Sequence, residues 1–459
     1  MPHKFHLFDA VLMAVVVVMV VEAITPAAAI GPAQFFWWGF LMVFFFVPYG
    51  LIASELGTTY PEAGGLYVWV RNAFGQRFGG RAAWLYWVNF PIWLASMAIL
   101  FVDSYTELFH VHVPAPVMLL VELAFVWGVV VVGNWPVAES KLLINAAAFA
   151  KMLLVIVLGV MGVYALLHHG MATKLTVATM LPHADMASLS KLSIIIFNFL
   201  GFEVVASMAP HMQNPRKQIP QALLLGGVLV MVFYLLAAFG ISAALPTKAV
   251  SGASGLIQSL VLLLQGQPLI VIGLGLLFMF TLFVEMVSWI GGVNSVATQA
   301  ALDKALPQAF AATNAHGQSV GAGRLTGLLA SLICVVMVPL ANTDAFTPVF
   351  TLNVVALLMA YLLMFPAFLK LRQKDPNAKR PFKVGGNRLV LTLMAVIPEL
   401  LLLATLVFTL LAVDSLVAGV ILWGGTFALL VIGEIVVRHQ HLVPVGAPQP
   451  TPVQAPLRR

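Results

Sequence analysis

Long apolar stretches, separated by short polar segments, follow one another along nearly the whole chain of 459 residues. A helix needs about 20 mostly apolar residues to cross a bilayer, and by that measure the sequence predicts about twelve membrane-spanning helices. Their expected ranges are 9–30, 35–57, 82–108, 115–133, 138–168, 190–211, 218–244, 267–297, 324–341, 345–371, 388–412 and 415–437. We therefore predict an all-α integral membrane protein with a single transmembrane domain, residues 1–437. The tail, residues 438–459, is rich in Pro and Gln, and we expect it to be disordered.

The composition excludes a soluble globular protein. Hydrophobic residues make up 61% of the chain and charged residues only 9%, whereas soluble domains carry about 25% charged residues. The net charge of +6 does not indicate nucleic acid, because the basic residues are spread over many short loops. A single cysteine, Cys334, excludes a disulfide framework. Metal-spaced histidines and phosphate-binding glycine motifs are missing, so we expect no metal, no cofactor and no enzyme active site.

Lys and Arg are distributed unequally between the two sides of the predicted helices. With the N-terminus inside, the outer loops hold only Lys174, Lys191 and Lys248, and nearly all other basic residues fall on the cytoplasmic side. Basic residues are enriched in cytoplasmic loops, so both termini are predicted to lie in the cytoplasm. Lys151 is the one basic residue that remains inside a predicted span.

Two of the predicted spans look interrupted. The first contains the run from Glu22 to Pro26, and proline cannot donate an intrahelical hydrogen bond. The sixth contains the run from Asn198 to Glu203, with Gly201 inside it. Interruptions at matching depth in the first and sixth spans favour two inverted repeats of about five helices each, with a binding site between them near the bilayer midplane. The alternative is that Pro26 only kinks a packing helix, as proline often does in membranes.

Four charged side chains lie deep inside predicted spans: Glu22, Lys151, Glu203 and Glu285. A charge at the bilayer centre costs a few kcal/mol, so each of them needs a function or a partner. Glu22 and Glu203 lie where the helices break, and a carboxylate beside exposed backbone groups would attract a cation. Glu285 and Trp289 share one helix face, and a carboxylate beside an indole suits an ammonium or guanidinium group.

Each of these residues also has a plainer interpretation. Glu22 and Glu203 could pair with Lys151 and only stabilise the fold. Glu285 could be protonated and simply hydrogen-bonded, and Trp289 could be a packing residue. Lys151 could be a fixed internal cation that braces the two repeats, or a titrating group that couples transport to protons.

Two sequence motifs resemble those of a known family. Residues 60–69 (YPEAGGLYVW), followed by Arg71, are similar to the cytoplasmic loop after the second span in the amino acid–polyamine–organocation superfamily. Residues 201–203 (GFE), followed by NPR at 214–216, resemble the sixth span of that superfamily and the loop behind it. The resemblance implies an inverted-repeat fold of the LeuT type with broken helices 1 and 6. It is closer to bacterial amine and amino acid exchangers, of the agmatine/putrescine and glutamate/aminobutyrate types, and to polyamine permeases.

The resemblance also implies roles for single residues. Polyamine permeases have an acid in span one and another in span eight, to which Glu22 and Glu285 are similar. Phe197 and Trp289 resemble the aromatic residues that line the pocket of arginine/agmatine exchangers. Lys151 resembles the fifth-span lysine of sodium-independent members, whose ammonium occupies a site that binds sodium in relatives. The resemblance therefore implies that Lys151 takes part in coupling transport to an energy source. The expected substrate-binding residues are Glu22, Ala23, Ile24, Thr25, Phe197, Gly201, Phe202, Glu203, Glu285 and Trp289.

The first span departs from the family pattern. Many amino acid permeases have a glycine-rich break there whose backbone amides hold the substrate carboxylate, whereas this chain reads TPAAAIG at residues 25–31. The departure favours an amine without a carboxylate. We therefore predict a secondary transporter of the exchanger class. Its substrate is expected to be a cationic amine such as agmatine or putrescine, or a cationic amino acid exchanged for its decarboxylated product.

Three other functions fit the sequence less well. A general, proton-coupled permease for neutral amino acids would use the buried acids for structure or coupling. A membrane enzyme or sensor would need a catalytic constellation or a signalling domain, and the sequence contains neither. A channel is disfavoured because broken helices near the midplane favour alternating access. The expected partners are a small-molecule amine or amino acid and the lipid bilayer of a bacterial cell membrane, not nucleic acid, and a homodimer is a candidate assembly.

Overall fold

The computed structural model describes residues 7, 11, 18–62, 64–135, 141–182, 185–202, 214–250, 255–340 and 344–440. All regular structure in these ranges is helical, and ten of the helices there are long and apolar enough to cross a membrane. The prediction of an all-α membrane protein is therefore confirmed. The first and sixth predicted spans are described only in part, and most of the predicted tail, residues 441–459, lies outside the described residues.

The long membrane helices agree with the predicted ranges to within several residues. They are α3–η2–α4 (Gln34–Leu41, Met42–Phe46, Val47–Thr59), α6 (Gln76–Phe109), α7 (Ala115–Gly133), α8 (Lys141–His168), α13 (Pro215–Ala244), α15 (Pro268–Leu302), α16–η7 (Val320–Met337, Val338–Leu340), α17–α18 (Phe346–Tyr361, Met364–Lys374), α19 (Arg388–Leu411) and α20–η8–α21 (Leu416–Gly419, Val420–Gly424, Gly425–Arg438). The shorter elements are η1 (Val21–Ala23), α2 (Ile24–Ala28), α5 (Leu66–Phe74), α9 (Val177–Met180), α10 (Met186–Ser190), α11 (Leu192–Phe197), η5 (Thr247–Ala249), α14 (Gly255–Leu263) and η6 (Gln308–Phe310).

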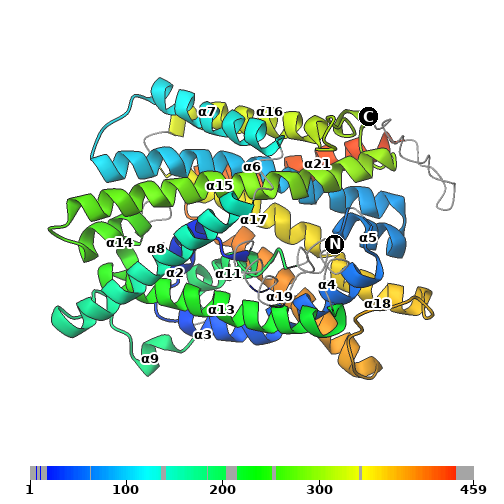
Figure 1. Ribbon diagram of the computed structural model, residues 1–459, viewed down its shortest axis with the longest axis horizontal. Coiled ribbons are helices and arrows are strands. Elements are labelled where there is room, and N and C mark those ends of the chain that lie inside the picture. Colours follow the sequence, from blue (N-terminus) through cyan, green and yellow to red (C-terminus); the bar gives the residue numbers. More distant parts are fainter. Residues whose placement is uncertain are drawn as a thin grey trace.

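The long helix α6 is the most deeply buried of the membrane helices in the described part of the chain. It packs against α7, α15, α16, α17 and α21, while α13 packs against α8 and α2. In Figure 1 the short helices α2 and α11 lie in the middle of the molecule, with α6 and α15 above them and α13 and α3 below. The two interrupted spans are therefore enclosed by long helices, which shields their exposed backbone groups from lipid.

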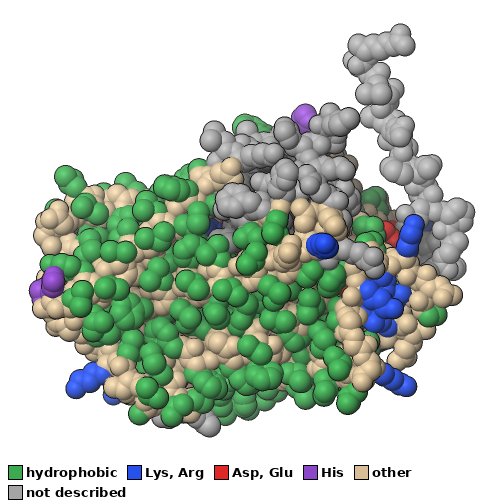
Figure 2. Space-filling view, turned by 60° about the horizontal axis from the view of Figure 1, so that its bottom comes forward, with side chains coloured by type: hydrophobic (Ala, Val, Ile, Leu, Met, Phe, Trp, Pro, Cys, Tyr) green, Lys and Arg blue, Asp and Glu red, His purple; other side chains and the backbone are tan. Residues whose placement is uncertain are grey.

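The outer surface carries many large apolar side chains. Leu269, Leu416 and Phe427 are among those with most of their area exposed. Figure 2 shows one face on which hydrophobic side chains cover the middle and most of the Lys and Arg side chains in view lie near the right-hand end. So large an apolar surface is incompatible with water and suits the hydrocarbon of a bilayer.

The loop that carried the first family motif is fixed to the end of α15. The guanidinium of Arg71, on α5, forms ion pairs with Asp303 and with Glu62, the latter at 2.8 Å. The hydroxyl of Tyr67 donates a hydrogen bond to the Asp303 carboxylate at 2.8 Å. Much of this motif therefore serves to join the loop after α4 to the C-terminal end of α15.

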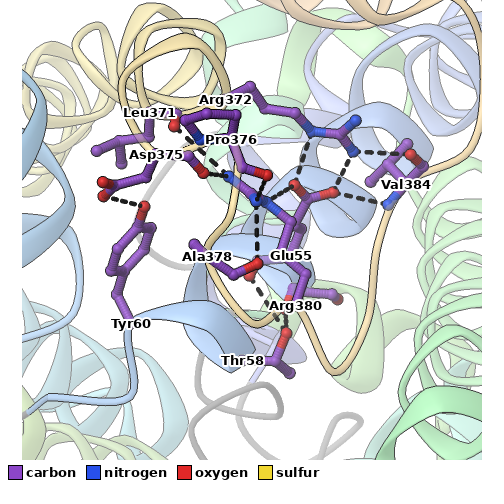
Figure 3. Close-up of polar contacts among 11 residues, drawn as sticks. Glu55, Thr58, Tyr60, Leu371, Arg372, Asp375, Pro376, Ala378, Arg380 and Val384 are labelled. Atoms are coloured by element: carbon purple, nitrogen blue, oxygen red, sulfur yellow. Dashed lines mark hydrogen bonds and ion pairs between the residues drawn. The ribbon is translucent and has the colours of Figure 1, made fainter.

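A buried carboxylate fixes the loop between α18 and α19 to the end of α4. Glu55 is 2% exposed, and its two oxygens accept hydrogen bonds from the guanidinium of Arg372, one of them at 2.8 Å. Arg380 lies 3.2 Å from the same carboxylate, and the backbone N–H of Val384 donates to it at 2.7 Å. Figure 3 shows these groups converging on Glu55, Arg372 from the end of α18 and Arg380 and Val384 from the loop, residues 375–387. Each oxygen has partners, as a buried charge requires.

A second contact in the same cluster joins the end of α4 to the end of α18. The hydroxyl of Tyr60 donates a hydrogen bond to the Asp375 carboxylate at 3.0 Å (Figure 3). Partial burial and the neighbouring Asp375 carboxylate raise the pKa of Tyr60 to about 12. The hydroxyl therefore keeps its proton, and this hydrogen bond persists at any physiological pH.

We expect Glu55→Gln to loosen the loop at residues 375–387. The neutral amide cannot match the charge of both guanidinium groups, so amide hydrogen exchange in the loop should accelerate about tenfold, which corresponds to about 1.4 kcal/mol. Hydrogen-exchange mass spectrometry of the protein in detergent measures this. The matched control is Glu434→Gln, which removes a part-exposed partner of Arg81 and Arg438 and should leave exchange in the loop unchanged. Unchanged exchange in both variants would contradict the expectation.

Candidate functional site

The first interrupted span breaks at Met19 and Val20, directly after the helical residue Val18. Val20 has extended backbone angles, with φ −98° and ψ 96°. The hydroxyl of Tyr234 accepts a hydrogen bond from Val20 N at 2.8 Å and donates one to Val18 O at 3.1 Å. Lys151 Nζ donates to Met19 O at 2.8 Å. Side chains from α13 and α8 thus satisfy backbone groups that a continuous helix would have paired internally.

This break lies earlier in the chain than the sequence predicted. The interruption was expected between Glu22 and Pro26, but Glu22 belongs to η1 and Pro26 lies inside α2. The interpretation of proline as the cause of the break was therefore wrong. Pro26 lies in the first turn of a helix, where the backbone N–H groups have no intrahelical partner and a proline is tolerated.

The second interrupted span breaks after α11. Gly201 has φ +103°, a backbone conformation that favours glycine, and its N–H donates a hydrogen bond to the hydroxyl of Tyr49 at 3.1 Å. The ring of Phe202 packs on that of Phe46 of η2, with ring centroids 4.8 Å apart. Phe202 does not line the cavity between the two breaks that is described below. Glu203, the third predicted residue of this run, lies outside the described residues.

Lys151 and Glu285 form an ion pair in the protein interior. Their side chains are 1% and 3% exposed, and Lys151 Nζ donates to Glu285 Oε2. The other oxygen, Oε1, accepts a hydrogen bond from the indole N–H of Trp289 at 2.9 Å. Both Glu285 oxygens thus have partners inside the protein, so the pairing of Lys151 with an internal acid that the sequence left open involves Glu285.

Glu22 differs from Glu285 because it has spare hydrogen-bonding capacity. Its side chain is 3% exposed, and Glu22 Oε1 has no hydrogen-bond partner among the described residues. The indole N–H of Trp93 lies beside this carboxylate and interacts with it, although it makes no hydrogen bond of ordinary geometry in the described part of the chain. A buried carboxylate whose oxygen Oε1 makes no hydrogen bond of ordinary geometry is unusual in a folded interior and indicates a place for a ligand.

A small cavity of about 20 Å³ adjoins this region, between the two breaks and the helices α6, α15 and α17. Its walls are formed by Val20, Tyr86, Asn89, Trp93, Phe197, Leu200, Gly201, Trp289, Val293, Leu357 and Tyr361. The ring of Trp93 stands edge-on to those of Phe197 and Trp289, at 5.5 and 5.7 Å between centroids. Five of the eleven lining residues are aromatic, so π-faces and ring edges form a large part of the cavity wall.

The structure brings together some of the predicted site residues and separates others. Phe197, Gly201 and Trp289 line the cavity, as the prediction requires of substrate-binding residues. Glu22, Ala23, Ile24, Thr25 and Glu285 are buried but do not line it, and the side chain of Thr25 faces Gly255 of α14 instead.

Sequence reasoning missed the contribution of α6. Tyr86, Asn89 and Trp93 all line the cavity from this helix. They stand three and four residues apart, which is the spacing of one helix face, so a stripe of polar and aromatic residues in an apolar span was a readable signal. Tyr361 of α17 carried no such signal, because it is a single tyrosine among aliphatic neighbours.

The arrangement suits a small organic cation. Aromatic faces attract ammonium and guanidinium groups, and a buried carboxylate adds a charged hydrogen-bond acceptor. Among the described residues, no group of three or more His, Cys, Asp or Glu side chains is placed to hold a metal ion.

Comparisons with known proteins give similarities over most of the chain. The family model for amino acid permeases matches residues 5–432. The probable agmatine/putrescine antiporter AguD of Lactococcus lactis subsp. lactis is 43% identical over 452 residues, covering 97% of each chain. The glutamate/gamma-aminobutyrate antiporter of the same subspecies is 26% identical over 371 residues, covering 78% of this chain and 73% of that protein. A probable polyamine transporter of Arabidopsis thaliana is 24% identical over 382 residues, covering 80% of this chain and 71% of that one.

Proposed function

Because this chain belongs to the amino acid permease family, we propose that it is a secondary transporter that exchanges small cationic amines, such as agmatine and putrescine, across a membrane. The observation that carries the proposal is the buried Glu22 carboxylate with one unpartnered oxygen, next to an aromatic cavity. The similarity to an agmatine/putrescine antiporter over nearly the full length of both chains supports the same substrate class. The Glu22 carboxylate would also attract a cationic amino acid and its decarboxylated product, so exchange of these two substrates fits the same site.

The charges around the cavity favour a cation over a neutral amino acid. Lys151 and Glu285 neutralise each other, which leaves the Glu22 carboxylate without a balancing charge from this pair. A substrate ammonium or guanidinium group supplies that charge, while Trp93, Phe197 and Trp289 provide π-faces for its apolar stem. We assign the second positive charge of a diamine to Glu203, the carboxylate that the sequence places beside Gly201.

The proposed transport cycle is alternating access. The two interrupted spans rock against the surrounding long helices, in a fold with two inverted repeats, and expose the cavity to one side at a time. Lys151 acts as a fixed internal cation in place of a transported ion. We further propose that the protein is not an enzyme, that it resides in a bacterial cell membrane with both termini in the cytoplasm, and that it assembles as a homodimer.

Exchange in proteoliposomes tests the proposal. Vesicles loaded with unlabelled putrescine should take up external labelled agmatine at a rate at least about tenfold above that of empty vesicles, because an exchanger requires a counter-substrate. Neutral amino acids should not compete. Uptake or exchange of neutral amino acids, without amine uptake, would instead support a general proton-coupled permease in which the buried acids serve structure and coupling.

A further inference from the structure

Two buried tyrosines hold the backbone at the two helix breaks, and we propose that they are positioning residues that set the shape of the substrate cavity. Tyr49 lies on α4 and Tyr234 on α13, and both are fully buried. Neither hydroxyl belongs to a residue that lines the cavity. Each instead binds a backbone N–H of a residue that does line it. The inference concerns the site assigned above and rests on that site being the transport site, although it does not depend on which substrate is carried.

Tyr234 holds the backbone of Val20 in the cavity wall. Its hydroxyl bridges the break, since it accepts from Val20 N at 2.8 Å and donates to Val18 O at 3.1 Å. Its ring is stacked on Trp38, with centroids 4.5 Å apart and planes 17° from parallel, so the hydroxyl has a fixed position. Val20 forms part of the cavity wall, two residues before Glu22. The bridge therefore also fixes the start of the turn that carries the Glu22 carboxylate.

Tyr49 holds the backbone of Gly201 in the cavity wall. The N–H of Gly201 donates to the Tyr49 hydroxyl at 3.1 Å, and Gly201 also lines the cavity. The Tyr49 ring is stacked on Phe45 at 5.7 Å and stands edge-on to Tyr361 at 5.9 Å, between centroids. Tyr361 is itself a lining residue. Tyr49 thus connects two parts of the cavity wall that come from distant parts of the chain.

The two contacts are arranged crosswise. Tyr49 lies in the helix that follows the first break but binds the second break, whereas Tyr234 lies in the helix that follows the second break but binds the first. The proposed pair of inverted repeats would produce this reciprocal pattern. In Figure 1, α4 and α13 lie on the same side of α6, and α13 packs against both α2 and α4. A movement of either broken helix must therefore break or carry with it a hydroxyl contact from the other half of the protein.

Removing only the hydroxyl groups separates positioning from packing. Tyr49→Phe and Tyr234→Phe keep the buried rings but leave the N–H of Gly201 or Val20 without its acceptor. Each variant should raise KM for exchange by roughly tenfold, with a smaller change in the maximal rate, because the cavity wall is no longer held in its binding shape. The control is Tyr164→Phe on α8, whose ring is exposed and remote from the cavity; it should leave both parameters unchanged.

The experiment measures KM and maximal rate in proteoliposomes and the thermal midpoint of the same proteins in detergent. The labelled substrate is putrescine, or a neutral amino acid if that is what the unmodified protein exchanges, so a wrong substrate class does not affect the outcome. Raised KM in both tyrosine variants, at an unchanged amount of folded protein, supports the proposal. Lowered thermal midpoints with unchanged KM, or loss of folded protein in both variants, would show that the hydroxyls serve stability alone and would overturn it.

Discussion

Glu22→Gln should nearly abolish amine exchange while the protein still folds and reaches the membrane. The side chain keeps its size, but its charge is lost in a buried site where one oxygen is unpartnered and available to a cation. Losing one partner of a buried charge pair costs about 3 kcal/mol or more, so kcat/KM for putrescine should fall by about 100-fold or more. Uptake of labelled putrescine into preloaded proteoliposomes measures the effect.

The matched control for this variant is Glu399→Gln. Glu399 also lies inside a membrane helix, α19, and one of its oxygens also lacks a partner in the described structure, but α19 contributes no residue to the cavity wall, whereas Glu22 lies two residues after the lining residue Val20. Its replacement should change putrescine uptake by less than about twofold, as for a residue without contact to substrate. Equal losses in both variants would show that intramembrane carboxylates act through stability. Full activity in Glu22→Gln would remove Glu22 from the binding site.

Breaking the Lys151–Glu285 pair should destabilise the protein strongly. Lys151→Met leaves the Glu285 carboxylate buried without its cation, and Glu285→Gln leaves the ammonium without its anion. Removing one partner of a buried pair costs about 3–5 kcal/mol. Each single variant should therefore unfold at markedly lower temperature or denaturant concentration in detergent, and its yield in the membrane should fall.

The double variant Lys151→Met/Glu285→Gln should recover much of the lost stability. It leaves no unpaired charge, and the glutamine oxygen can still accept from Trp289. The coupling energy between the two positions should be about 2 kcal/mol or more. Additive losses would contradict the ion pair as the main stabilising contact of both residues. The sequence alone favoured Glu285 as a direct substrate ligand, whereas its internal pairing makes reduced stability the first expected defect.

The membrane helices could be predicted from the sequence because the signal is local. A span is recognised by the length of its apolar run, and for that reason the predicted range 115–133 coincides with α7 (Ala115–Gly133). The helix α14 (Gly255–Leu263) was missed because it is too short to give that signal. The sequence also identified Phe197 and Trp289, through their resemblance to aromatic residues of a known family, and both line the cavity.

The parts that could not be predicted depend on neighbours that are distant in sequence. The position of the first break is set by Tyr234 and Lys151, which offer hydrogen bonds to Val18, Met19 and Val20. No local feature of the first span reveals those partners, whereas Pro26 is a visible but misleading signal. Lys151 of α8 pairs with Glu285 of α15 and not with Glu22 of η1. This pairing likewise depends on how these three helices pack against one another.

The tethered ammonium of Lys151 has a consequence for the energy source of transport. Its positive charge is covalently attached and already neutralises Glu285, so under the proposed exchange mechanism no dissolved cation is needed at that carboxylate. If the two exchanged amines carry equal charge, one turnover moves no net charge, and the membrane voltage, worth about 2.3 kcal/mol per charge per 100 mV, neither drives nor opposes it. Under the proposed mechanism the driving force is the concentration ratio of the two amines, at about 1.4 kcal/mol for each factor of ten. Accumulation of one amine is then limited by how fast the cell produces the other.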